Sequence, residues 1–136
     1  MRAHGEFLAG AVGDIAGVSG TTIGQWARWG YIRASHSDGD PHVYAFEDVL
    51  EALMVKALLD RGVSRPMIRR AIAQLGSSYG DWPLSEARLA TAEGGRRPKI
   101  VLREDGGAFA LSPRGWQRMV APPPLEDVRL RLRRAR

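Results

Sequence analysis

The chain contains the sequence Gly17-Val-Ser-Gly-Thr-Thr-Ile-Gly-Gln-Trp-Ala-Arg-Trp-Gly-Tyr-Ile32, which predicts a short, capped helix. Ser19 is a good N-cap, because its hydroxyl can accept a hydrogen bond from an amide in the first helical turn. Residues at helical spacing define an inward face that ends in a glycine. These residues are Ile23, Trp26, Ala27 and Gly30. The outward face carries polar residues, namely Thr21, Thr22, Gln25 and Arg28.

Another helical pattern lies directly before this segment. Val12, Ile15 and Ala16 share one face of a predicted helix over residues 9–16, and Gly17 can adopt the left-handed conformation that turns the chain. Two short helices joined in this way predict a helix-turn-helix, whose second helix fits the major groove of DNA.

A hairpin wing and two further helices are predicted next. Residues 33–41 are polar and turn-forming, and an extended apolar pattern resumes at Val43. Helical periodicity extends over residues 47–61, and Ser64 caps a fourth helix that ends before Gly76.

The polar face of the capped helix suits contact with base edges. Threonine can meet a thymine methyl or a phosphate, and glutamine can pair with adenine. We therefore expect Thr21, Thr22 and Gln25 to recognise DNA, while Arg28 lies near enough to the helix end to reach the backbone. The alternative is an ordinary solvated helix face, which the agreement of cap, phase, glycine stop and wing disfavours.

After Gly76 the pattern becomes extended. Residues 99–103 and 108–111 flank a Glu-Asp-Gly-Gly link, which predicts a hairpin of undecided register. Residues 84–89 fit either a third strand or a short helix. The fold class expected from the whole pattern is mainly α, a winged helix-turn-helix with a small C-terminal β-hairpin appendage.

Three regions are expected along the chain. Residues 1–76 form the DNA-binding domain, and residues 77–121 form the hairpin appendage, which packs on that domain or builds a dimer or partner interface. Residues 122–136 form a basic segment, for which a solvated tail is favoured over a partner contact. Apolar residues at helical spacing in this segment are Leu125, Val128 and Leu132.

Composition and charge narrow the classes of function. The 136 residues include no cysteine, no apolar run of membrane-spanning length and no export pattern, so a cytoplasmic protein without disulfides or membrane association is expected. The pI of about 10.4 favours a polyanionic partner. Residues 1–76, however, hold eight basic and eight acidic side chains, so the case for DNA depends on where individual arginines project.

Catalytic and metal-binding motifs are weak in this sequence. It has no phosphate-binding glycine loop, glycine-flanked nucleophilic serine or helical histidine pair, so no enzyme activity is expected. The loop with His36, Asp38, Asp40 and His42 has metal-ligand types, but turn formation explains it more simply, and no metal or other cofactor is expected. Trp26 is expected in the core, and Trp29 is left open between a core position and stacking on a base or planar effector.

The order and spacing of these elements resemble the N-terminal winged helix-turn-helix of the MerR family of transcription regulators. The resemblance covers residues 7–75, and it implies that the second helix contacts bases and phosphates while the wing reaches the adjacent minor groove or backbone. The segments that carry it are residues 12–19, 22–26, 30–32, 43–49 and 58–64. Where the family commonly carries Arg then Tyr, this chain has Gly24 and Gln25, and His42 replaces the usual wing Arg.

The combined expectation is a sequence-specific DNA-binding transcription regulator. A homodimer on a pseudo-palindromic operator is expected, because one short helix reads too few base pairs of double-stranded DNA. Specific recognition is assigned to three residues of the second helix, and anchoring to the others. The candidate DNA-binding residues are Ser19, Thr21, Thr22, Gln25, Arg28, Arg33, His42, Tyr44 and Arg69.

Two alternatives remain at this point. Residues 83–89 and 100–107 are weakly similar to the middle of antitoxin-type regulators, which implies a toxin-like protein partner bound through the C-terminal half and regulation of its own operon. A phage-type excisionase or architectural DNA-binding protein would share the fold, and it would bend DNA.

Overall fold

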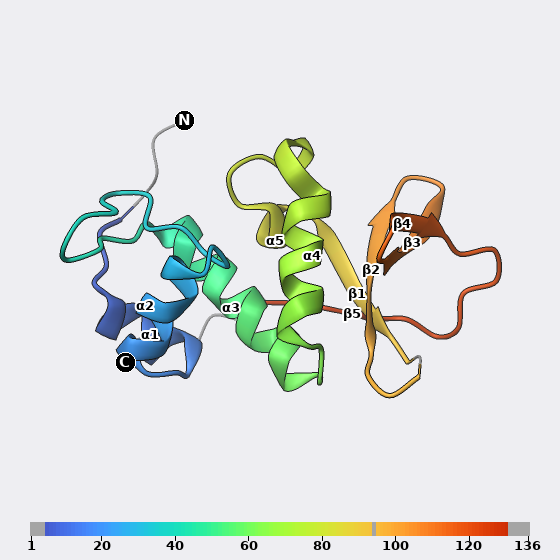
Figure 1. Cartoon of the computed structure of the whole chain (residues 1–136), viewed down its shortest axis with the longest axis horizontal. Coiled ribbons are helices and arrows are strands. Elements are labelled where there is room, and N and C mark those ends of the chain that lie inside the picture. Colours follow the sequence, from blue (N-terminus) through green and yellow to red (C-terminus); the bar gives the residue numbers. More distant parts are fainter. Residues whose placement is uncertain (1–4, 94, 131–136) are drawn as a thin grey trace. The chain divides into compact units, whose positions relative to one another are not determined.

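The computed structural model describes residues 5–130 except Gly94. The chain divides into two compact units. Residues up to Lys56 belong to the first, together with Leu130, and residues from Ala57 to Arg129 form the second. Helix α3 continues through this division. In Figure 1 helices occupy the first half of the described chain and strands occupy most of the second.

Helices α1 (Ala9–Ala16), α2 (Gly20–Arg28) and the first turns of α3 (Phe46–Asp60) belong to the first unit. The predicted bounds of α1 are confirmed, and Gly17 ends this helix in the left-handed conformation at φ 81°. The predicted cap of α2 is also confirmed, because the Thr22 amide donates to Ser19 Oγ over 3.0 Å. Local signals in the sequence therefore define both helices of the helix-turn-helix.

Two close backbone approaches join α1 to α2. A Cβ atom on Gly13 would lie 2.5 Å from the carbonyl oxygen of Val18, and one on Gly20 would lie 3.1 Å from the amide nitrogen of Gly10. Because backbone atoms cannot move aside as side chains do, the tight turn between the helices requires glycine at these positions.

The core of the first unit is built from the inward faces of the predicted helices. Ile23 and Trp26 of α2 are buried, as predicted, and they share this core with Val12 and Val49. Trp29, which the sequence left open, is 42% exposed and lies edge-on to Tyr31, with ring centroids 5.7 Å apart. The buried aromatic side chain in α2 is thus a packing residue.

The wing is a short hairpin held by few backbone hydrogen bonds. Ser37 and Val43 form an antiparallel bridge in which the Val43 amide donates over 2.8 Å. A second bridge pairs Phe7 with Tyr44. The predicted wing is confirmed, and its tip is exposed.

In the second unit, the end of α3 leads into α4 (Arg65–Leu75), a 3-10 turn (Gly76–Tyr79) and the short helix α5 (Pro83–Glu86). Ser64 caps α4 as predicted, accepting from the Met67 amide over 3.3 Å. None of the described helices has the length and apolar character needed to cross a membrane.

The second unit also contains a five-stranded antiparallel sheet in the order β4-β3-β2-β1-β5. The predicted class of a mainly α fold with a small hairpin is therefore wrong in its C-terminal part. Only the central pair was evident from the sequence, because β4 and β5 are short and β5 pairs with β1, a strand more than thirty residues earlier. The strands are β1 (Arg88–Ala92), β2 (Lys99–Glu104), β3 (Gly107–Ser112), β4 (Gly115–Arg118) and β5 (Glu126–Asp127).

The predicted hairpin is the β2–β3 pair. Glu104 lies opposite Gly107, so the link is a two-residue turn, Asp105–Gly106, with Gly106 at φ 82°. This conformation is typical of tight hairpin turns and settles the register that the sequence left undecided.

The two ambiguous C-terminal segments also have definite structures. Residues 84–89 divide between α5 and β1, so both of the interpretations offered for them are partly correct. Leu125 and Val128 do not lie on a helix, because β5 forms between them. Leu132 lies outside the described residues.

Candidate nucleic-acid interface

The polar side of α2 forms one part of the candidate interface. Thr21 and Arg28 are exposed, while Thr22 and Gln25 are partly buried. At the start of the helix, the hydroxyl oxygens of Ser19 and Thr22 lie 2.9 Å apart and share a hydrogen bond. Ser19 thus fixes both the first turn and the orientation of the Thr22 side chain.

Gly24 affects the position of the charge at the end of α2. A Cβ atom on Gly24 would lie 3.5 Å from Nη1 of Arg28, so the guanidinium extends back along the helix over the glycine. The family that the sequence resembles commonly has an arginine in this part of the helix, and in this chain the guanidinium of Arg28 places a positive charge there.

A surface hollow lies between the end of α2 and the wing. Arg28, Arg33 and His42 line it, so three of the predicted anchoring residues meet at one place. Two guanidinium groups around an exposed hollow favour a phosphate, since arginine donates to anions through several N–H groups. Asp38 also lines the hollow and opposes an anion there.

A buried carboxylate fastens the base of the wing to α3. Oδ2 of Asp48 accepts hydrogen bonds from the Ser35 amide at 2.9 Å, the Ser35 hydroxyl at 2.6 Å and the Ala45 amide at 2.7 Å. The bond to Ala45 caps α3, because Asp48 lies in its first turn and reaches back to the amide before the helix. The contact of Asp48 with Ser35 requires the folded wing, because the two residues lie thirteen positions apart in the chain.

Tyr44 and His42 lie side by side at the wing. The Tyr44 side chain is fully buried, and within the described residues its hydroxyl has no hydrogen-bond partner. Burial is the main cause that raises the pKa of Tyr44, Asp48 raises it further, and Arg28 lowers it. The ring meets His42 edge-on, with centroids 6.1 Å apart. Tyr44 therefore supports His42 by packing, and its hydroxyl does not lie on the surface.

The remaining predicted residue, Arg69, is exposed on α4 and belongs to the second unit. The structure brings together Arg28, Arg33 and His42 within the first unit. Among the described residues, no three His, Asp or Glu side chains are grouped so that they could hold a metal ion.

The capped helix pair and the wing define the class of a winged helix-turn-helix. The family described as MerR HTH family regulatory protein matches residues 8–75, which is half of the chain. This protein belongs to the MerR family.

Three curated relatives share this region. They are described as uncharacterized HTH-type transcriptional regulators, one from Mycobacterium bovis and two from strains of Mycobacterium tuberculosis. Each is 37% identical over 66 residues, which is 46% of this chain and 29% of the relative. The chain thus corresponds to less than a third of the length of these relatives. No solved structure matches it significantly.

Proposed function

We propose that this protein binds double-stranded DNA sequence-specifically, as a dimer on a pseudo-palindromic operator, and thereby regulates transcription. The observation that carries the proposal is the capped helix α2, whose polar side lies within a domain of the MerR family. A short helix of this kind can enter the major groove, where each base pair offers a distinct set of hydrogen-bond groups.

Base recognition is assigned to Thr21, Thr22 and Gln25. Gln25 can pair with the two hydrogen-bonding groups of adenine, and a threonine methyl can contact that of thymine. Thr22 is pre-oriented by its hydrogen bond to Ser19, so it loses less conformational entropy on binding.

Phosphate anchoring is assigned to the hollow between α2 and the wing. Arg28 and Arg33 supply the charge, and His42 adds a hydrogen-bonding group beside them. The N-cap Ser19 and Arg69 of the second unit are further phosphate contacts in this proposal, while Tyr44 acts by packing under the wing. Phosphate contacts set the register of the protein on DNA, and base contacts select the sequence.

The test is selection of bound sequences from a random DNA library, with the full chain and with the double variant Thr22→Ala/Gln25→Ala. The parent should enrich one motif with inverted symmetry, and the variant should bind DNA with little enrichment. Gln117→Ala on exposed β4 is a matched control that should enrich the parental motif. A correctly folded double variant that enriches the same motif as the parent would overturn the assignment.

A further inference from the structure

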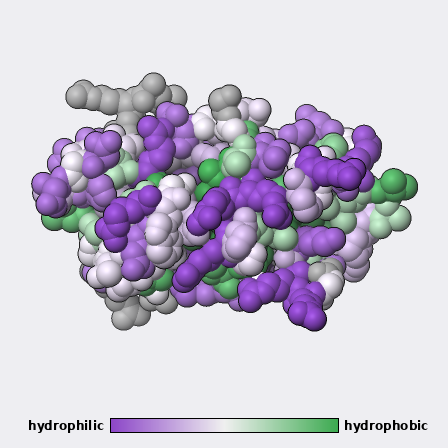
Figure 2. Space-filling model, in the orientation of Figure 1, coloured by the Kyte–Doolittle hydropathy of each residue, from purple (hydrophilic) through white to green (hydrophobic). Residues whose placement is uncertain are grey.

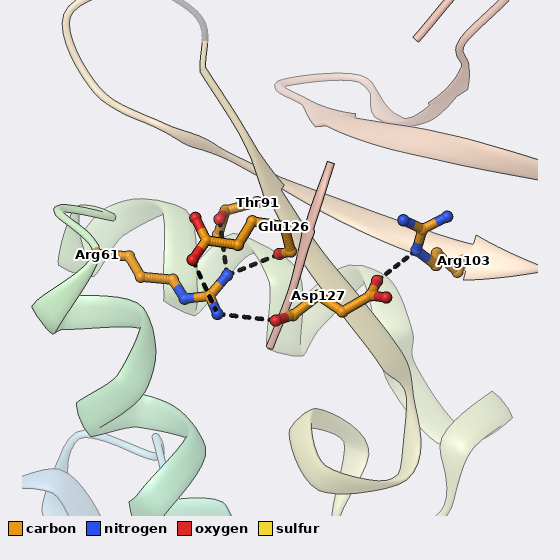
Figure 3. A network of polar contacts seen from close by, with 5 residues as sticks. All are labelled: Arg61, Thr91, Arg103, Glu126 and Asp127. Carbon is orange, nitrogen blue, oxygen red and sulfur yellow. Dashed lines mark hydrogen bonds and ion pairs between the residues drawn. The ribbon is translucent and has the colours of Figure 1, made fainter. Parts of the chain in front are cut away.

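An arginine side chain holds the C-terminal strand β5 in place by hydrogen bonds to its main-chain carbonyl groups. Arg61, which follows α3, donates through Nη1 to the carbonyl oxygen of Glu126 at 2.7 Å and through Nη2 to that of Asp127 at 2.8 Å (Figure 3). Nη1 also donates to the hydroxyl of Thr91 on β1 at 3.0 Å. Arg61 thus bridges the edge of β1 and the strand that covers it.

Two further contacts involve the side chains of β5 and of the residue before it. Nε of Arg103 on β2 donates to Oδ1 of Asp127 at 2.5 Å, as Figure 3 shows. Leu125 packs against a group of small buried residues on the face of the sheet that Arg103 shares. These residues are Ala90, Ala92, Val101 and Ala108.

The backbone pairing of β5 is short. It consists of the partners Ala90–Asp127 and Thr91–Glu126, followed by a hydrogen bond from the Val128 amide to Leu89 at 2.9 Å. Both residues of β5 are exposed. Because the pairing involves so few residues, β5 can detach without unfolding the remaining strands of the sheet.

The connection that leads to β5 has the character of a hinge. β4 and β5 lie on opposite edges of the sheet, and Met119 and Leu125 pack on it at the two ends of the connection. All residues between them, 120–124, are exposed, and Val120 is 97% exposed. This connection swings away from the sheet in Figure 1, and apolar side chains stand out at that edge in Figure 2. Its three successive prolines have no N–H to donate and favour an extended chain.

We propose that β5 exchanges between two copies of this chain, so that residues 125–128 of each copy complete the sheet of the other. A bare β1 edge would present unpaired backbone groups, which favour pairing with another strand. Exchange restores every contact of Arg61 and Arg103, because the incoming strand has the same sequence as the one that leaves. It is therefore a low-cost route to a dimer.

Among strands that another molecule could supply, one from a second copy fits this site, because it has the same sequence as the strand that the site already binds. Arg61 binds main-chain carbonyl groups and would accept many strands, but the Arg103 contact requires a carboxylate and the small residues leave room for the side chain of Leu125. The segment 125–128 supplies all of these in order. The inference rests on the proposed function only in that it explains how the expected dimer forms.

The test uses two full-length variants, Thr91→Cys and Glu126→Cys, because the chain has no cysteine and these positions are directly opposite each other. Both variants keep the contact of Arg103 with Asp127 and the bonds from Arg61 to the main-chain carbonyl groups of β5. The two proteins are mixed in reducing buffer, incubated at increasing concentration and then oxidised. A covalent dimer containing one copy of each variant should form, and its yield should rise with concentration. Replacing the second variant by Gln117→Cys, on the opposite edge strand, should remove the product.

A chain that carries both cysteines measures the same pairing within one molecule. If this chain closes on itself while the mixture yields no mixed dimer, β5 remains in its own sheet and the proposal is wrong. Sedimentation of the unmodified protein provides a second measurement, in which the mass should rise from one chain to two as the concentration increases. A mass of one chain at every concentration would also overturn the exchange.

Operator selection separates this inference from the proposed function. A protein that enriches a DNA motif but gives no mixed dimer refutes only the exchange of β5. A protein that exchanges β5 but enriches no motif refutes only the assignment of DNA recognition.

Discussion

At the scale of single residues, two glycines in α1 have opposite environments. A Cβ atom on Gly10 would meet nothing within 4 Å, whereas one on Gly13 would lie 2.5 Å from the Val18 oxygen. Gly10→Ala should raise the free energy of unfolding by about 0.5 kcal/mol, because alanine loses less backbone entropy in a helix. Gly13→Ala should lower it by about 2 kcal/mol or more through backbone displacement.

Urea denaturation of the two variants measures this difference. Because both substitutions add the same methyl group to the same helix, each variant controls for the other. Equal stability of the two proteins would contradict the close packing of α1 against the turn.

Arg33 and Gln25 should affect DNA binding in different ways. Arg33→Ala should weaken binding to all sequences to a similar degree and reduce the slope of log affinity against log salt by about 1, because one phosphate contact is lost. Gln25→Ala should cost about 1–3 kcal/mol on the selected operator and little on other DNA.

Titration of binding with salt, on the operator and on unrelated DNA, distinguishes the two effects. If the Arg33→Ala variant has the same salt dependence as the parent, Arg33 does not contact a phosphate. If Gln25→Ala loses the same amount of affinity for all DNA sequences, Gln25 does not recognise a base.

The ionisation of Tyr79 provides a test of its hydrogen bond to Glu104 in the C-terminal unit. Its hydrogen bond to Glu104 is the main cause that raises its pKa from the ordinary 10.0 to about 12, with smaller contributions from burial and the Glu104 charge. A raised pKa in the folded state means that the stabilisation is complete below pH 10.0 and is lost as the pH rises to about 12.

Tyrosinate absorbance should therefore show one of the three tyrosines of this chain ionising near pH 12, and Tyr79→Phe should remove that step. Glu104→Gln should shift the step towards the ordinary value of tyrosine. Because burial also raises the pKa of Tyr44, the size of the step decides the result. A step near pH 12 that is undiminished in Tyr79→Phe would assign it to another tyrosine.

At the scale of elements, the wing depends on Asp48. Asp48→Ala leaves three donors without their acceptor at the base of the wing, so the free energy of unfolding should fall by about 2–4 kcal/mol. Ser35→Ala removes only one side-chain donor and should cost about 1 kcal/mol.

Urea denaturation measures both values, and proteolysis between residues 33 and 43 measures local opening of the wing. Asp48→Ala should be cleaved there sooner than Ser35→Ala. A stability of Asp48→Ala equal to that of the parent would mean that these hydrogen bonds contribute nothing to the fold.

At the scale of the whole molecule, the proposed dimer should require both halves of its operator. Each recognition helix contacts only a few base pairs, so binding is tight when two half-sites are read together. Scrambling one half of the selected operator should reduce affinity towards that for unrelated DNA. Affinity that is unchanged by this scrambling would show that one copy is sufficient.

The sequence by itself determined the elements whose signals are local. Ser19 and Ser64 cap helices that begin where they were predicted, and Gly17 ends α1, because a cap or a left-handed turn depends on residues only a few positions apart. The order of these elements was also sufficient to indicate the MerR family. The exposed part of the candidate site on α2 was predictable for the same reason.

Only the tertiary structure decided the features that join distant parts of the chain. Asp48 became the anchor of the wing and Tyr44 a core residue through contacts that helical periodicity does not encode. The five-stranded sheet was missed because β5 pairs with a strand more than thirty residues earlier and is held by Arg61 across 65 positions. Pairing and burial of this kind depend on the three-dimensional surroundings of a residue, and short segments carry little intrinsic preference for them.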